Sequence, residues 1–279
     1  MTYISTSCLK NPRNVVNVLT EYEKAGIENV ELGSVHEFFD VNLLKKFNFN
    51  FIIHNYFPPP KEEFNLNLAS KNEIIRSKSI NLAKTAINLC SDLNSPLYSF
   101  HAGFTVDPQK LGKAFSKRGI IDREKSINTY SESIIEIIEF ADSRGISVAM
   151  EPNVVQKFNL INGKNELCLF AEYDEIQQLF KMISNKKFGL LLDLGHTSVT
   201  SHWLKFDKDS FIEKFKSKII AIHASNNNGI SDQHKSLTKD CWATSKLKMF
   251  KNIPISLETM NLTTDEIKMN LKIVEDSIK

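Results

Sequence analysis

Eight short apolar runs recur along the chain and are separated by longer stretches of mixed polarity. Most runs have a fully apolar centre, as in FIIH at 51–54, GLLLD at 189–193 and IIAIH at 219–223. Strands that are buried on both faces have such continuous runs, and parallel sheets produce them. We therefore predict eight buried strands: Tyr3–Ser7, Asn29–Ser34, Phe51–Tyr56, Leu97–Gly103, Ser147–Asn153, Phe188–Thr197, Ile219–Asn226 and Ile255–Met260.

The stretches between these runs show helical periodicity. In the first of them, Val15, Val18, Leu19 and Tyr22 recur at the spacing of one helix face. The same spacing predicts helices over Asn14–Ala25, Ser79–Leu93 and Tyr130–Ala141. Short polar residues predict helix N-caps at Ser126, Asp174, Asp209 and Thr263, and Glu266 completes a capping box with Thr263.

Strands that alternate with helices indicate βαβ units and a parallel sheet. Eight units in 279 residues fit a (β/α)₈ barrel, and a doubly wound sheet is the alternative. The lengths of the connections favour the barrel, because long connections gather where strands end and form its functional face. The predicted long connections are Phe57–Leu68, Phe104–Ile121, Val154–Ala171, Ser198–Lys208 and Asn227–Asp240. We predict a single TIM barrel domain over residues 1–279, with a site at the C-terminal face of the strands.

The composition is that of an ordinary globular protein, with 42% apolar and 24% charged residues. This excludes a disordered or fibrous chain. The net charge of +2 is below that of a dedicated nucleic-acid binder. We expect no membrane span and no secretory signal peptide. The four cysteines are widely spaced and form no C-x-x-C pair, so we expect reduced thiols and a cytoplasmic protein.

Histidines and carboxylates gather where the predicted strands end. His54, His101, His196 and His223 lie in or directly after strands, and His234 follows in the next loop. Four acidic residues occupy similar positions at or after the strand ends: Glu151, Asp193, Asp232 and Glu258. One such residue alone is more often a hydrogen-bonded structural group. Here six successive strands end in a histidine or an acidic residue at one barrel mouth. Bringing so many unpaired carboxylates and imidazoles together costs free energy unless a cation compensates their charge.

Imidazole and carboxylate without thiolate suit zinc, manganese, iron or cobalt. An inner quartet of residues ends the four predicted strands that are adjacent in a closed barrel: Glu151, Asp193, His223 and Glu258. The remaining residues form an outer group of further candidate ligands: His54, His101, His196, Asp232 and His234.

These motifs together resemble the xylose-isomerase-like TIM barrel superfamily over nearly the whole chain. The specific part comprises FHAG (100–103), EPN (151–153), DLGH (193–196), IHASNNNGISDQH (222–234) and LE (257–258). The superfamily includes sugar and sugar-phosphate isomerases and epimerases, and AP endonucleases of the endonuclease-IV type.

The isomerase branch implies one divalent ion held by the inner quartet. It also implies proton transfer by Glu151 and Glu258, and sugar oxygens oriented by His196 and His101. The endonuclease branch implies three zinc ions held by all nine residues. The expected cofactor is therefore manganese, zinc or cobalt, with one ion expected and up to three allowed by the ligand set.

The residues around the ligands favour the isomerase branch. The endonucleases carry Pro-Gly-Ser after the strand-four histidine, where this chain has Ala102-Gly103-Phe104. They carry Asp-Arg-His where this chain has Asp232-Gln233-His234, so an arginine that would face phosphate is absent. Acidic residues are also interspersed among the basic residues of the loops predicted at the C-terminal face of the barrel, which reduces the positive charge there. These basic residues are Lys61, Lys110, Lys113, Lys117, Arg118, Lys157, Lys164 and Lys235.

The first hypothesis is a metal-dependent sugar or sugar-phosphate isomerase or epimerase that works by proton transfer through a metal-stabilised enediolate. Phe57, Phe104 and Trp203 would either close over the sugar or simply pack the long loops. The second hypothesis is a multinuclear zinc phosphoesterase of the AP endonuclease type. A binding barrel without catalysis and a lyase or dehydratase remain as further alternatives. We expect a small sugar rather than DNA as the partner, and barrels of this superfamily are often homo-oligomers.

Overall fold

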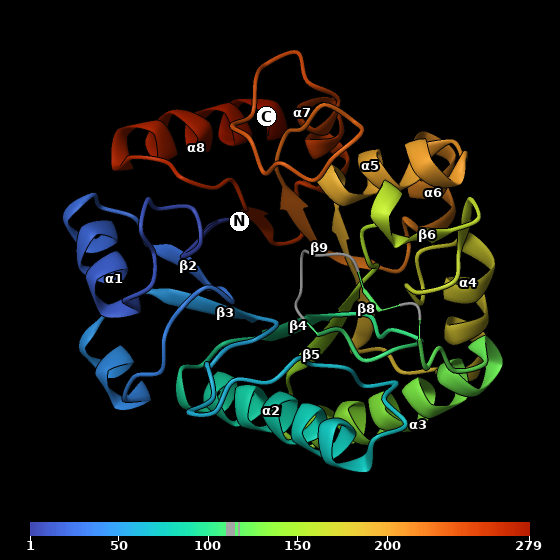
Figure 1. Ribbon diagram of the computed structural model, residues 1–279. Helices are drawn as coiled ribbons and strands as arrows, with labels where there is room; N and C mark the ends of the chain where they lie inside the picture. The colour runs from blue at the N-terminus through green and yellow to red at the C-terminus, as the bar shows by residue number, and fades with distance from the viewer. Residues whose placement is uncertain (110–114, 117) are drawn as a thin grey trace.

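The computed structural model describes residues 1–109, 115–116 and 118–279 of the chain. Eight parallel strands close into a barrel in the order β1-β2-β3-β4-β5-β8-β9-β10. The TIM barrel prediction is therefore confirmed (Figure 1). The barrel strands are β1 (Thr2–Ser5), β2 (Asn29–Leu32), β3 (Asn50–His54), β4 (Leu97–His101), β5 (Ser147–Glu151), β8 (Phe188–Asp193), β9 (Ile219–Ala224) and β10 (Ile255–Leu257).

Helices surround the barrel on its outside, as the ring of coiled ribbons in Figure 1 shows. They are α1 (Val15–Lys24), α2 (Glu73–Asp92), α3 (Arg123–Asp142), α4 (Tyr173–Met182), α5 (Leu194–Leu204), α6 (Lys208–Phe215), α7 (Trp242–Lys246) and α8 (Thr264–Ile278). Short 3₁₀ helices and a two-stranded hairpin occupy the connections: η1 (Val41–Lys46), η2 (Lys157–Asn159), η3 (Leu247–Phe250), β6 (Leu160–Ile161) and β7 (Lys164–Asn165).

The outward faces of the strands pack against the helices and form the main hydrophobic core. A second apolar cluster fills the inside of the barrel and consists of Tyr3, Ile52, Leu97, Ala149, Leu191 and Ala221. Side chains two residues apart on a strand point to the same face. His54, Glu151, Asp193 and His223 each lie two residues beyond a member of this cluster, so they also point into the barrel. The apolar cluster is therefore the floor beneath the polar residues.

All eight barrel strands end two to four residues earlier than predicted, and the largest difference is in the sixth, β8. The apolar run led us to extend it to Thr197 and to predict a loop over Ser198–Lys208, but β8 ends at Asp193. The Asp193 carboxylate accepts a hydrogen bond from the His196 N–H at 2.7 Å and caps α5, which continues to Leu204. N-capping by a carboxylate ends the strand and starts the helix at the same residue.

Three of the four predicted N-caps are wrong. Helix α3 begins at Arg123, three residues before Ser126, and its N-cap is Asp122, which accepts a hydrogen bond from Lys125 N–H. Helix α6 is capped by Asp207 rather than Asp209, and Asp174 lies in the first turn of α4 rather than at its cap. Thr263 does cap α8, and its predicted capping box with Glu266 is present.

Two further observations bear on the composition. All four cysteines are free. Among the helices of the described residues, none combines the length and apolarity that crossing a membrane requires.

Candidate metal centre

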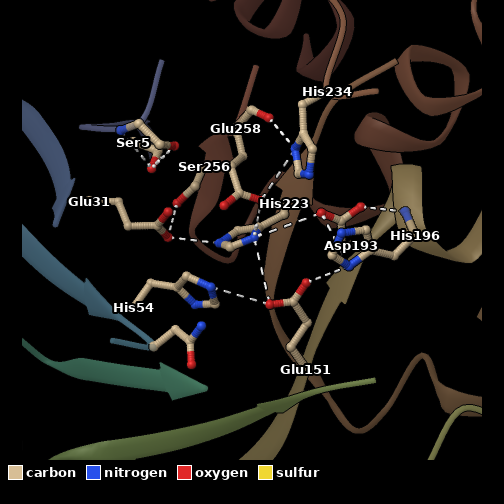
Figure 2. A network of polar contacts seen from close by, with 12 residues as sticks. Ser5, Glu31, His54, Glu151, Asp193, His196, His223, His234, Ser256 and Glu258 are labelled. Carbon is tan, nitrogen blue, oxygen red and sulfur yellow. Dashed lines mark hydrogen bonds and ion pairs between the residues drawn. The ribbon is translucent and has the colours of Figure 1, made fainter. Parts of the chain in front are cut away.

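The nine candidate residues lie together at the C-terminal end of the barrel. Five neighbouring strands provide one residue each: His54, His101, Glu151, Asp193 and His223. Glu258 directly follows β10, His196 lies in the first turn of α5, and Asp232 and His234 lie in the loop after β9. Figure 2 shows seven of the nine side chains turned toward one another.

The Glu151 carboxylate lies at the centre of this group and is completely buried. Its oxygens lie 3.4 Å from His54 Nε2, 3.4 Å from His101 Nδ1 and 2.8 Å from His196 Nδ1. Two groups of residues with the spacing of metal ligands share it: His54–Glu151–His223 and His101–Glu151–His196. A carboxylate shared in this way could bridge two ions.

The inner quartet converges on one nitrogen of His223. Its Nδ1 lies 2.9 Å from Glu258 Oε2, 3.9 Å from Asp193 Oδ2 and 4.0 Å from Glu151 Oε2. Strand register explains part of this convergence, because Asp193 is paired with His223 across β8 and β9. The four residues can therefore surround one cation.

A further group lies nearer to the barrel mouth. Asp232 Oδ2 lies 3.4 Å from His196 Nε2 and 3.2 Å from His234 Nε2. The three residues have the spacing of ligands to one ion. His196 therefore connects this group to Glu151, since its other ring nitrogen faces that carboxylate.

The hydrogen bonding of the imidazoles fits a cation in the centre. His54 Nδ1 bonds with the Ser99 hydroxyl, and His234 Nδ1 donates to the backbone oxygen of Glu258. In both cases the outer ring nitrogen bonds to the protein and the other nitrogen turns inward. This is how histidines that bind metals are usually held.

Many of the inward-facing atoms have no hydrogen-bond partner although they lie close to one another. The unpartnered atoms are both oxygens of Glu151, Asp193 Oδ2, Asp232 Oδ1, and the Nδ1 atoms of His101, His196 and His223. Buried polar atoms are normally satisfied, and an unpaired carboxylate is costly. A divalent cation would satisfy these atoms, and imidazole with carboxylate suits zinc, manganese or cobalt. The residues present thus fit a divalent metal.

The pKa values describe the competition between burial and neighbouring charge. Burial lowers the pKa of His101 to about 4 against the opposing effect of Glu151. Burial also opposes protonation of His234, but the hydrogen bond to Asp232 and the charge of Glu258 raise its pKa to about 9. Burial raises the pKa of Asp193 to about 6. Without a cation, protons on imidazoles balance the carboxylates, so a binding metal ion would displace them.

Glu31 is a member of this network that the sequence analysis did not identify. It lies in β2, is completely buried, and accepts hydrogen bonds from His223 Nε2 at 2.9 Å and from the Ser256 hydroxyl at 2.8 Å (Figure 2). The available signal was one acidic residue within the short run NVEL. Because that strand has no His or Asp at its end, it stood outside the pattern that revealed the others.

A pocket of about 740 Å³ opens above these residues. Six of the nine candidates line it: His54, His101, His196, Asp232, His234 and Glu258. Of the three aromatic residues considered for closing over a sugar, Phe104 lines the pocket, whereas Phe57 is buried in the main core and packs on Phe39 and His36. Trp203 is not part of the lining and packs against a smaller apolar cluster.

The basic residues of the loops contribute little to this pocket. Among the described residues that line it, Arg13 is the only lysine or arginine. Lys110, Lys113 and Lys117 lie outside the described residues. A pocket with one basic side chain in its described wall offers few partners for the phosphates of a DNA strand.

Comparison with protein families matches residues 41–275 to a family described as xylose isomerase-like TIM barrel. The chain is 27% identical over 279 residues to apurinic-apyrimidinic endonuclease 1 of Plasmodium falciparum, covering 92% of this chain and 40% of that protein. It is 27% identical over 201 residues to a probable endonuclease 4 of Aquifex aeolicus, covering 67% of this chain and 62% of that protein. The chain thus spans less than two thirds of these relatives.

Two solved structures share the fold. A D-tagatose 3-epimerase-like protein superposes with a TM-score of 0.69 at 20% identity, covering 100% of this chain and 99% of that one. D-allulose 3-epimerase from Methylomonas sp., in complex with D-allulose, gives a TM-score of 0.66 at 12% identity, covering 99% and 95%. At these identities the similarity concerns the fold alone.

Proposed function

This chain belongs to the xylose isomerase-like TIM barrel family, and from that premise we propose that it is a divalent-metal-dependent isomerase or epimerase of a sugar or sugar phosphate. The observation that carries the proposal is the convergence of Glu151, Asp193 and Glu258 on His223 Nδ1 at the floor of a pocket. The volume of that pocket is within the range of small-molecule sites.

The inner quartet would hold the cation: Glu151, Asp193, His223 and Glu258. When bound there, a divalent cation supplies Lewis-acid stabilisation of the negative charge that develops on substrate oxygens. The side chains of this chain would carry out the proton transfers.

Glu258 is better placed than Glu151 to take a proton from the substrate. Glu258 lines the pocket, whereas the Glu151 carboxylate is completely buried beneath His54, His101 and His196. The two glutamates follow β10 and end β5, with β8 and β9 between them. Glu258 would return the proton it has taken at the neighbouring carbon. Delivery to the opposite face would require a separate proton on Glu151, with the abstracted proton left on Glu258.

His101 and His196 line the same pocket and would orient the hydroxyl groups of the substrate. The binding of D-allulose by a protein of the same fold supports a sugar as the ligand class. The class extends to sugar phosphates, for which Arg13 in the pocket wall offers a cationic partner.

A multinuclear metal phosphoesterase is the second candidate. It is favoured by the group of His196, Asp232 and His234, which a single-ion epimerase does not require. The named endonucleases among the relatives agree with this candidate. The chain has Gln233 between Asp232 and His234, and Arg13 is the single basic residue in the described pocket wall. A small phosphoester is therefore the better substrate class for this candidate than DNA.

Exchange with deuterium oxide separates these two functions. The protein is loaded with manganese, cobalt or zinc and incubated with a panel of ketoses and ketose phosphates in D₂O, and carbon-bound deuterium is followed by NMR. We expect deuterium at the reacting carbon with at least one substrate, and none with chelator-stripped protein. Phosphate release with oxygen from H₂¹⁸O, without carbon-bound deuterium, would replace this proposal with the phosphoesterase.

A further inference from the structure

Glu31 is buried in the barrel, and no lysine or arginine of the described residues pairs with it. Its carboxylate is 0% exposed, and His223 is its only charged partner among the described residues. The strand ladders bring the group together, because Ser256 is paired with His223 and Ser5 is paired with Glu31. Burying a carboxylate is costly, so this position calls for a specific role.

The hydrogen bonds of Glu31 determine which nitrogen of His223 carries a proton. An ionised carboxylate only accepts hydrogen bonds, so His223 Nε2 must donate across the 2.9 Å separation. Once a cation has displaced the proton from His223 Nδ1, that nitrogen presents its lone pair on the side where Glu258, Asp193 and Glu151 lie. The Ser256 hydroxyl donates to the same oxygen of Glu31 and keeps that carboxylate in place.

We propose that Glu31 is a positioning residue that holds His223 in the Nε2–H form, with Nδ1 directed at a divalent cation in the inner quartet. This inference rests on the proposed function, since it requires a cation at the quartet. A carboxylate behind a histidine ligand orients the ring and strengthens it as a donor.

Glu31, His223 and Glu258 also have the spacing of ligands to one ion, but Glu31 lies on the opposite edge of the His223 ring from Asp193 and Glu151. Glu31 meets the Nε2 edge of the His223 ring, and Glu258 meets the Nδ1 edge. An ion held by the quartet at Nδ1 would be separated from Glu31 by the imidazole ring. Glu31 would therefore act on the ion through His223.

Metal affinity in variants of Glu31 tests this role directly. Zinc affinity is measured by competition with a chromophoric chelator for Glu31→Ala, Glu31→Gln and wild type. We expect 10- to 100-fold weaker binding in Glu31→Ala, the usual effect of removing such a partner. Glu31→Gln keeps the volume and an acceptor but loses the charge, so it should lie between Glu31→Ala and wild type. Glu28→Gln is the control, because Glu28 is an exposed carboxylate three residues away.

The ring nitrogens of His223 give a second measurement that does not depend on activity. In the zinc-loaded protein, ¹⁵N NMR should place the proton on Nε2 in wild type. A proton on Nδ1 would overturn the inference, as would folded Glu31 variants that bind zinc as tightly as wild type and Glu28→Gln. If Glu31→Ala does not fold, Glu31→Gln decides the question. Wild-type protein that binds no metal would instead refute the proposed function.

Discussion

Replacement of Glu258 by glutamine should remove most of the proton transfer while preserving the shape of the site. Burial alone would raise the pKa of Glu258, but His223 and His234 hold it well below its usual range. The carboxylate is therefore ionised at neutral pH, and it lines the pocket where a substrate would lie. Glutamine has a similar size but cannot accept the proton.

The expected loss follows from the ordinary contribution of a general base. Such a group accelerates a reaction by roughly 10²–10⁴-fold, which corresponds to about 3 to 5 kcal/mol of transition-state stabilisation. Glu151 cannot take over this role, because His54, His101 and His196 enclose its carboxylate. We therefore expect Glu258→Gln to lose at least about 100-fold in turnover.

The assay is the rate of deuterium uptake from D₂O into the substrate carbon. Glu258 is also a candidate ligand, so wild type and variant are compared at saturating manganese with the bound metal measured in both. Glu62→Gln, an exposed carboxylate after β3, is the matched control and should exchange at the wild-type rate. Exchange by metal-loaded Glu258→Gln within about threefold of wild type would refute the assignment of Glu258 as the base.

Three further predictions follow from particular residues. Burial lowers the pKa of His36 to about 4, so between pH 6.5 and 4 only the unfolded chain takes up this proton. The contribution of His36 to the free energy of unfolding should therefore fall by about 3 kcal/mol as the pH drops through that range, and urea unfolding should show a weaker pH dependence in His36→Asn than in wild type. Replacing both Asp232 and His234 by alanine should remove one ion per chain, measured by elemental analysis, if their group binds metal; unchanged content would contradict that assignment. Gly195→Ala would place a Cβ 2.5 Å from the Ser225 hydroxyl, so it should shift the start of α5 and weaken metal binding at Asp193 by calorimetry, whereas wild-type affinity would show that the helix start adapts.

Much of the fold could be predicted because the barrel strands are buried on both faces. Such strands appear as continuous apolar runs, and all eight lie where these runs indicated. The ends of the elements were harder to predict. The apolar run of β8 continues past Asp193 into Leu194, and the change from strand to helix is marked by the hydrogen bond that the Asp193 carboxylate accepts from His196 N–H. The N-caps were missed because several short polar residues lie near each helix start, and the sequence does not show which of them accepts the hydrogen bond.

The candidate site could be predicted as a set of residues but not as an arrangement. Position at strand ends brought out His54, Glu151 and His223, because parallel strands end at one edge of a barrel. The sharing of Glu151 between two ligand groups depends on side-chain directions, which no spacing in the sequence reveals. Glu31 was missed because it lies inside a strand, and its role depends on residues about 190 to 225 positions away.

The metal content of the protein tests the central claim most directly. The protein is purified without added metal, dialysed against zinc or manganese, and examined by elemental analysis beside a variant carrying both Asp193→Asn and His223→Ala. The account predicts at least one tightly held ion per chain in wild type and the loss of that ion in the double variant. About one ion supports the isomerase, and nearly three favour the phosphoesterase. Wild-type protein that holds no divalent cation, or a folded double variant that holds as much as wild type, would contradict the account.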